Sequence, residues 1–289
     1  MTEWKAYCIY LNQWLELQVD FEEITGKPFT THMGLLIKIS IGVIVVQSYF
    51  AVYMGSNTLT QPMWYHKYVY MFVFISLSQQ LFLWVICQYE SSRMGLLLKE
   101  YISEVLSSSS PMNNPANAYK LRLMWLRLVY VVKLLGNASF TIIVLLSVGG
   151  IIFLSGAYVI MSSLIQGDSR AKEFLGPVII GAMVITVIGE FSHKTTERVG
   201  TDICEALVNL KSAGMDQETT KEVERFLRIA AFNTPSVSLA GLAIIDRSTL
   251  VSIGKNVITY LIVLIQFQLT NDEQPTAMKQ SQKNQTLAL

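Results

Sequence analysis

The segment from Ser139 to Ile165 reads SFTIIVLLSVGGIIFLSGAYVIMSSLI and holds no Asp, Glu, Lys, Arg or His in 27 residues. A helix crosses the hydrocarbon layer of a membrane in about 20 residues. The alternative, a soluble protein with buried helices, gives no reason for an apolar run of this length. We therefore interpret the stretch as a membrane-spanning helix.

Four further apolar segments reach or approach the same length on either side of it. With the first, the predicted spans lie at 33–54, 66–88, 138–165, 174–192 and 250–269. They predict an all-α, polytopic integral membrane helical bundle in which residues 1–289 form a single membrane domain.

The composition argues against a soluble enzyme and against nucleic acid as a partner. Hydrophobic residues make up 52% of the chain and charged residues only 15%, where soluble domains average about 25%. The net charge of +1 supplies no basic excess. Glu190 and His193 have the Glu-x-x-His spacing of di-metal helix bundles, but the chain has no second such pair. No phosphate-binding loop, zinc pair or nucleophile elbow occurs either, so we expect no metal, no cofactor and no catalytic residue.

The distribution of Lys and Arg predicts the orientation. If the N-terminus is cytoplasmic, inner segments carry 17 of the 22 Lys and Arg, as cytoplasmic loops do. Five crossings then place the C-terminus outside, where Asn284 is a candidate glycosylation acceptor in Asn-Gln-Thr. Cys8, Cys87 and Cys204 are too few for a disulfide framework, and two of them face the reducing cytosol in this orientation.

Long inner segments predict a cytoplasmic helical anchor built from residues 93–133 and 193–249. Thr219 and Glu222 have the spacing of a capping box, which predicts the start of a helix that ends at Asn233-Thr234-Pro235. Serines and prolines at 107–115 predict a flexible elbow. The expected bundle core is a set of apolar residues at helical spacing: Val199, Ile203, Leu207, Leu210, Val223, Phe226, Leu227 and Ala230.

The last predicted span has polar residues along one helical face. Steps of four and three residues connect Ser252, Asn256, Thr259, Val263, Gln266 and Thr270. Polar groups in a bilayer need water or polar partners, so this stripe predicts a water-lined pore with Val263 as its apolar constriction. The alternative is that the stripe forms hydrogen bonds to other helices of the same subunit.

This helix resembles the C-terminal signature of insect gustatory receptors. The signature residues are Thr259-Tyr260, then five apolar residues, then Gln266-Phe267, and residues 243–250 resemble the family segment that leads into it. The resemblance implies a ligand-gated, non-selective cation channel that detects small-molecule tastants. It also implies a homo- or hetero-tetramer with other gustatory receptors, embedded in lipid at the plasma membrane of chemosensory neurons.

The sequence departs from the family pattern in two places. The family has seven spans, and the five predicted here match the third to the seventh, so that Met1 to Thr31 corresponds to the inner segment before the third span. An alternative function is therefore a truncated, non-conducting subunit that only assembles with full-length partners. Leu261 stands where the sugar-responsive branch has Glu, which disfavours a sweet ligand. A secondary transporter would show internal repeats and broken helices, and neither is visible.

Outer halves of the predicted spans offer a ligand pocket. The candidate residues are aromatic or polar at helical spacing: Tyr68, Phe72, Gln79, Gln80, Tyr158 and Ser162. The alternative for these residues is helix packing, with the amides satisfied between helices.

Overall fold

The computed structural model of the chain describes residues 3–30, 64–106, 114–166, 171–211, 216–239 and 241–286, together with 38–39, 41–42 and 45. Helices dominate these residues, as predicted. They are α1 (Glu3–Thr25), α3 (Trp64–Val105), α4 (Pro115–Asn137), α5 (Phe140–Gln166), α6 (Ala171–Thr196), α7 (Asp202–Lys211), α8 (Gln217–Phe232) and α9 (Arg247–Thr286). A π-helical turn, η1 (Glu197–Thr201), joins α6 to α7. Two short strands, β1 (Ser238–Leu239) and β2 (Ala243–Ile244), are a departure from the all-α prediction.

Four of the five predicted spans fall within helices of the structure. Span 66–88 lies in α3, 138–165 matches α5 apart from its first two residues, 174–192 lies in α6 and 250–269 lies in α9. Span 33–54 lies outside the described residues except for five helical positions. Within the described residues, three helical segments are long and apolar enough to cross a membrane: Phe140–Gln166, Phe174–Leu210 and Arg247–Phe267. The count of five spans and the orientation stay predictions.

The chain divides into two compact units. The first comprises Met1–Leu145 and Ile188–Asp246, and the second comprises Leu146–Val187 and Arg247–Leu289. Helices α5 and α6 contribute to both units, because one boundary falls within each of them, and the third boundary falls directly before α9.

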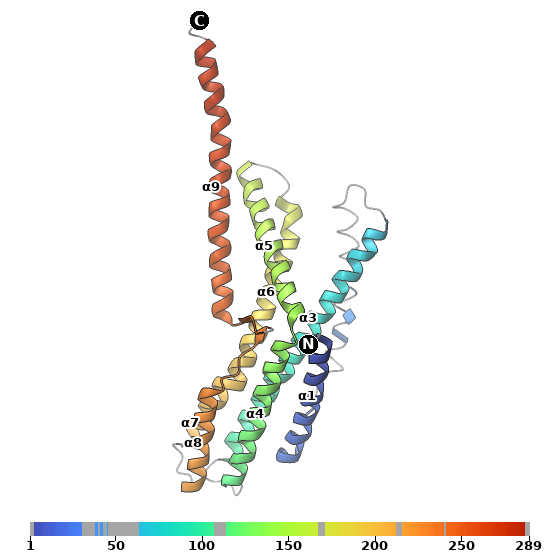
Figure 1. Ribbon diagram of the computed structural model, residues 1–289, viewed down its shortest axis with the longest axis vertical. Coiled ribbons are helices and arrows are strands. Elements are labelled where there is room, and N and C mark those ends of the chain that lie inside the picture. The colour runs from blue at the N-terminus through green and yellow to red at the C-terminus, as the bar shows by residue number, and fades with distance from the viewer. Residues whose placement is uncertain are drawn as a thin grey trace. The chain divides into compact units, whose positions relative to one another are not determined.

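The first unit is a helical bundle in which α1, α3, α4, α7 and α8 lie side by side (Figure 1). The apolar stripes predicted for the anchor form part of its core: Val199, Ile203, Leu207, Leu210, Val223, Phe226 and Ala230 are all buried, and Leu227 is half-buried. Helix α1 contributes a second stripe, Tyr10, Trp14, Leu17 and Phe21, spaced four, three and four residues apart. Burial raises the pKa of Tyr10 well above its ordinary value, so its phenol stays neutral.

The predicted capping box of α8 is wrong. The helix begins earlier, at Gln217, and its N-cap is Asp216, whose carboxylate accepts a hydrogen bond from the Glu218 amide at 3.3 Å. Thr219 is buried inside the first turn. Glu222 pairs with Arg122 of α4 rather than with the start of its own helix, because a buried carboxylate gains more from a guanidinium than from a backbone amide.

The predicted end of α8 agrees with the structure. Helix α8 ends at Phe232, directly before the Asn-Thr-Pro sequence. Helix α4 begins at Pro115, and the Asn114 side chain caps it by accepting from the Asn117 amide at 2.8 Å. The elbow predicted at 107–115 overlaps the start of α4 at Pro115, and its residues 107–113 lie outside the described part.

In the second unit, α5 and α6 approach each other through glycines. A Cβ added to Gly181 would lie 2.8 Å from the carbonyl oxygen of Gly149 and 3.4 Å from Phe153. Small residues at such a contact let helix backbones pack closely, which is how helices associate in a bilayer.

We expect Gly181→Ala to destabilise the protein by about 1–3 kcal/mol, since the added methyl group meets a backbone oxygen that cannot rotate away. Gly150→Ala is the matched control, because a Cβ there meets nothing within 4 Å. Thermal unfolding in detergent micelles should show a lower midpoint for the Gly181 variant alone. Equal midpoints for the two variants would contradict the packing of α5 against α6.

Candidate functional site

The predicted polar stripe lies on α9, and its side chains are exposed. Ser252, Asn256, Thr259, Gln266 and Thr270 all belong to the exposed class, and Val263 between them is 41% exposed. The Thr259 hydroxyl donates to the Lys255 carbonyl at 3.0 Å and the Thr270 hydroxyl to the Gln266 carbonyl at 2.9 Å. These two bonds stay within the helix, so they satisfy the hydroxyl protons without another helix.

The other faces of α9 are also largely uncovered by the chain itself. Among the described side chains of α9, Val257 is buried and Ile253 is half-buried. Tyr260, Leu264 and Phe267, which share a face with these two, are exposed. An apolar helix of this length needs lipid or other protein chains around it, because exposed apolar area on this scale is unfavourable in water.

The predicted pocket residues are divided between the two units. Phe72, Gln79 and Gln80 are exposed on α3, in the first unit. Tyr158 and Ser162 are half-buried on α5, in the second unit. The side chain of Tyr68 lies outside the described part. A role for these residues in ligand binding stays a prediction.

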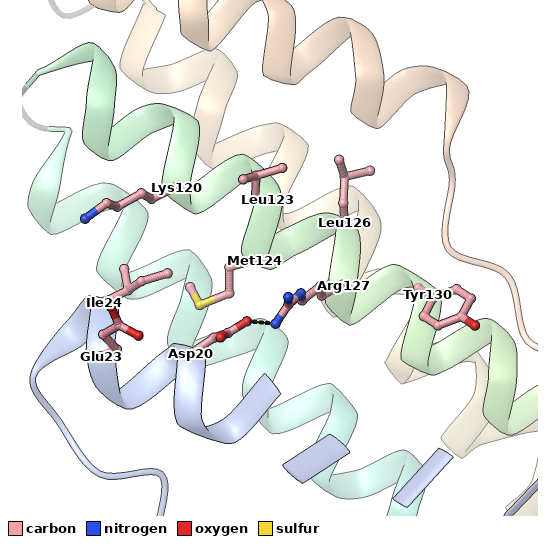
Figure 2. Close-up of a pocket in the computed structure, with 9 residues that line it drawn as sticks. All are labelled: Asp20, Glu23, Ile24, Lys120, Leu123, Met124, Leu126, Arg127 and Tyr130. Carbon is pink, nitrogen blue, oxygen red and sulfur yellow. Dashed lines mark hydrogen bonds and ion pairs between the residues drawn. The ribbon is translucent and has the colours of Figure 1, made fainter. Parts of the chain in front are cut away.

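A groove that the sequence did not predict lies between α1 and α4. Its volume is about 490 Å³, and it is lined by Asp20, Glu23, Ile24, Lys120, Leu123, Met124, Leu126, Arg127 and Tyr130. Figure 2 shows the Asp20 carboxylate and the Arg127 guanidinium pointing toward each other across it, where they form an ion pair. The pair links α1 to α4 over a sequence distance that no local pattern reveals, so it had no detectable signal in the sequence.

A second ion pair links α4 to α8 inside the bundle. Arg122 Nη2 lies 2.7 Å from Glu222 Oε1, and both side chains are largely buried. Arg225 approaches the other carboxylate oxygen at 3.3 Å. The Arg122 guanidinium also stacks over the Tyr119 ring, with 5.0 Å to its centroid. These contacts hold α8 against α4.

Inside the bundle, Trp125 of α4 contacts the π-helical turn. Trp125 is fully buried, and its indole Nε1 donates to the Val199 carbonyl at 2.7 Å. Its ring lies 5.5 Å from that of Phe226, measured between centroids. A π-helical turn interrupts the regular backbone bonding of a helix, which leaves the Val199 carbonyl available to this donor. The sequence predicted the burial of Val199 and Phe226 but not the turn.

The chain is similar to known chemosensory receptors over most of its length. A profile of the family described as 7tm chemosensory receptor matches residues 4–271. Gustatory and odorant receptor 22 of Anopheles gambiae is 26% identical over 290 residues, which cover 95% of this chain and 58% of that one. Gustatory and odorant receptor 21a of Drosophila melanogaster is 26% identical over 271 residues, or 91% of this chain and 58% of that one. The chain thus spans 58% of the length of both relatives.

The fold is similar to that of a solved insect receptor. The olfactory receptor OR5 from Machilis hrabei superposes with a TM-score of 0.58 at 12% sequence identity, covering 91% of this chain and 78% of that one. At this level of identity the likeness concerns the fold alone.

Proposed function

Because the chain belongs to the 7tm chemosensory receptor family, we propose that it is a subunit of a ligand-gated cation channel that detects small molecules. The family match confirms the resemblance of the last helix to insect gustatory receptors. Two relatives are named gustatory and odorant receptors, so we include both tastants and volatile odorants in the ligand class. We propose the plasma membrane of chemosensory neurons as the site of action.

The observation that carries the proposal is the exposed polar stripe of α9. Five polar side chains share one face of a helix long and apolar enough to span a membrane, and they are exposed in the single chain. In lipid, such side chains are stable only against water or polar partners. Several copies of the chain arranged around an axis, with this face inward, supply both. A tetramer of identical or related subunits meets this requirement.

The proposed mechanism uses the connection between the bundle and α9. Ligand binding among the outer halves of the helices shifts α9, and the shift widens the ring formed by Val263 from each subunit. Thr259, Gln266 and Asn256 line the water path on either side of that ring. Residues 93–133 and 193–249 form the cytoplasmic anchor, and the ion pair between Arg122 and Glu222 keeps α8 fixed while α9 moves.

Whole-cell current recording tests the proposal. Cells expressing the 289-residue chain should pass cation current when sugars, bitter compounds or volatile odorants are applied, and antibody should label the C-terminal tail on intact cells. A chain that reaches the surface but conducts only when co-expressed with a longer family member would be a partner-dependent subunit. A surface-labelled chain that conducts in neither setting would contradict the channel proposal.

A further inference from the structure

The short hairpin between α8 and α9 has an exposed apolar tip. Strands β1 and β2 pair in antiparallel register, Ser238 with Ile244 and Leu239 with Ala243. The Leu242 amide donates to the Leu239 carbonyl at 2.9 Å, and this bond closes a tight turn. Gly241 has φ +73° there, a conformation that other residues rarely adopt. The turn therefore presents Leu242 in a defined position.

One side of the hairpin packs on the bundle, and the other does not. Val237, Leu239 and Ile245 are buried, whereas Leu242 is 75% exposed and Ile244 is 56% exposed. Isolated exposed apolar residues are common on proteins. A hairpin with two of them at its outer side needs a more specific explanation, because hydrophilic residues would serve equally well at a surface in contact with water alone.

The level of the hairpin along the bundle is fixed by a backbone contact. A Cβ added to Gly136, in the last turn of α4, would lie 2.5 Å from the Ser238 carbonyl oxygen, so β1 rests directly on the end of α4. Helix α5 begins at Phe140, four residues further on, and is one of the membrane-spanning candidates. The span that starts α9 begins at Arg247, three residues after Ile244. The hairpin therefore lies where two spans begin.

We propose that the hairpin tip inserts into the inner surface of the bilayer, with Leu242 and Ile244 in contact with phospholipid at the boundary between headgroups and acyl chains. The inference rests on the membrane insertion of α5 and α9 that the proposed function also assumes. Apolar side chains at this boundary gain by leaving water, and Phe140 at the same level is likewise exposed. The contact holds the linker between the anchor and α9 at a constant depth.

Photo-crosslinking of the full chain tests the proposal. A diazirine amino acid is introduced at 242, and the protein is reconstituted in phosphatidylcholine vesicles, illuminated, digested and analysed by mass spectrometry. The matched control is Val208 of α7, which is 56% exposed, the same fraction as Ile244. Val199 is level with Trp125, which donates to its carbonyl. Along α4, Trp125 lies about 16 Å below Gly136 at about 1.5 Å per residue. Helix α7 follows Val199 and runs further away, so Val208 lies far from the membrane. Ile151, exposed in the middle of α5, serves as the span control.

We expect phospholipid adducts at 242 and at 151 and none at 208. A crosslink from 242 to a second copy of the chain, without lipid adduct, would overturn the proposal and make the tip a subunit contact. Lipid adducts at 208 as well as 242 would overturn it too, since exposure alone would then explain both. An adduct at 151 but not at 242 refutes the hairpin contact and leaves the membrane spans intact. Absence of adducts at 151 contradicts membrane insertion and, with it, the proposed function.

Discussion

Replacing Val263 with Ser is expected to raise the resting current by at least about tenfold. Val263 interrupts an otherwise polar face of α9 and is 41% exposed, so in a ring of subunits it forms the narrow apolar zone from which water withdraws. The free energy of removing apolar surface from water is about 0.8 kcal/mol per methylene group. A free-energy change of about 1.4 kcal/mol alters an equilibrium tenfold. Summed over several subunits, the loss of apolar surface at the ring therefore raises the resting current by more than tenfold. Whole-cell recording without ligand measures it directly.

Leu264→Ser is the control for this substitution. Leu264 is the next residue, and its exposed fraction of 40% nearly equals that of Val263, but it points about 100° away around the helix. We expect its resting current to match that of the unmodified chain. Equal currents for both variants and the unmodified chain, with normal surface expression, would contradict the assignment of Val263 as the gate.

Replacing Trp125 with Ala is expected to lower the free energy of unfolding by about 3–5 kcal/mol. The indole is fully buried, packs against Phe226 and donates to the Val199 carbonyl. Its removal leaves a cavity in the bundle and a buried acceptor without a donor. Trp125→Phe keeps an aromatic ring and loses the hydrogen bond, so we expect a smaller loss of about 1–3 kcal/mol. Thermal unfolding in detergent micelles measures both.

Tyr130→Ala provides the comparison on the same helix. Tyr130 is 50% exposed, and exposed substitutions usually change stability by no more than about 0.5 kcal/mol. A Trp125→Ala protein as stable as the Tyr130→Ala protein would mean that the bundle does not depend on the contact between α4 and the π-helical turn.

Local sequence patterns predicted most of the helices and much of the core, but they did not predict α1. Apolar length is a property of neighbouring residues, so α5, α6 and the first half of α9 could be predicted from composition alone. Helical spacing likewise predicted the burial of Val199, Ile203 and Phe226. Stop signals such as the Asn-Thr-Pro sequence after Phe232 placed the end of α8, because they act on the residues beside them.

Contacts between distant residues could not be predicted. The hydrogen bond from Trp125 joins residues 74 positions apart, and the choice of Glu222 between its own helix and Arg122 depends on where α4 lies. The hairpin has strands of two residues each, which is too short for an alternating pattern to be detected. The polar stripe of α9 was visible because it belongs to one helix, whereas a ligand pocket needs several helices in known positions.

We propose that the polar face of α9 lines water while the chain spans a membrane. Substituted cysteines test it most directly, in a chain whose Cys8, Cys87 and Cys204 are replaced by Ser or Ala. Single cysteines at Asn256, Thr259 and Gln266 are compared with cysteines at Val257, Leu264 and Phe267, using a membrane-impermeant thiol reagent and a mass-tag assay that needs no current. We predict labelling at the first three positions and protection at the other three. Equal labelling of both sets, or labelling of the second set alone, would contradict the account.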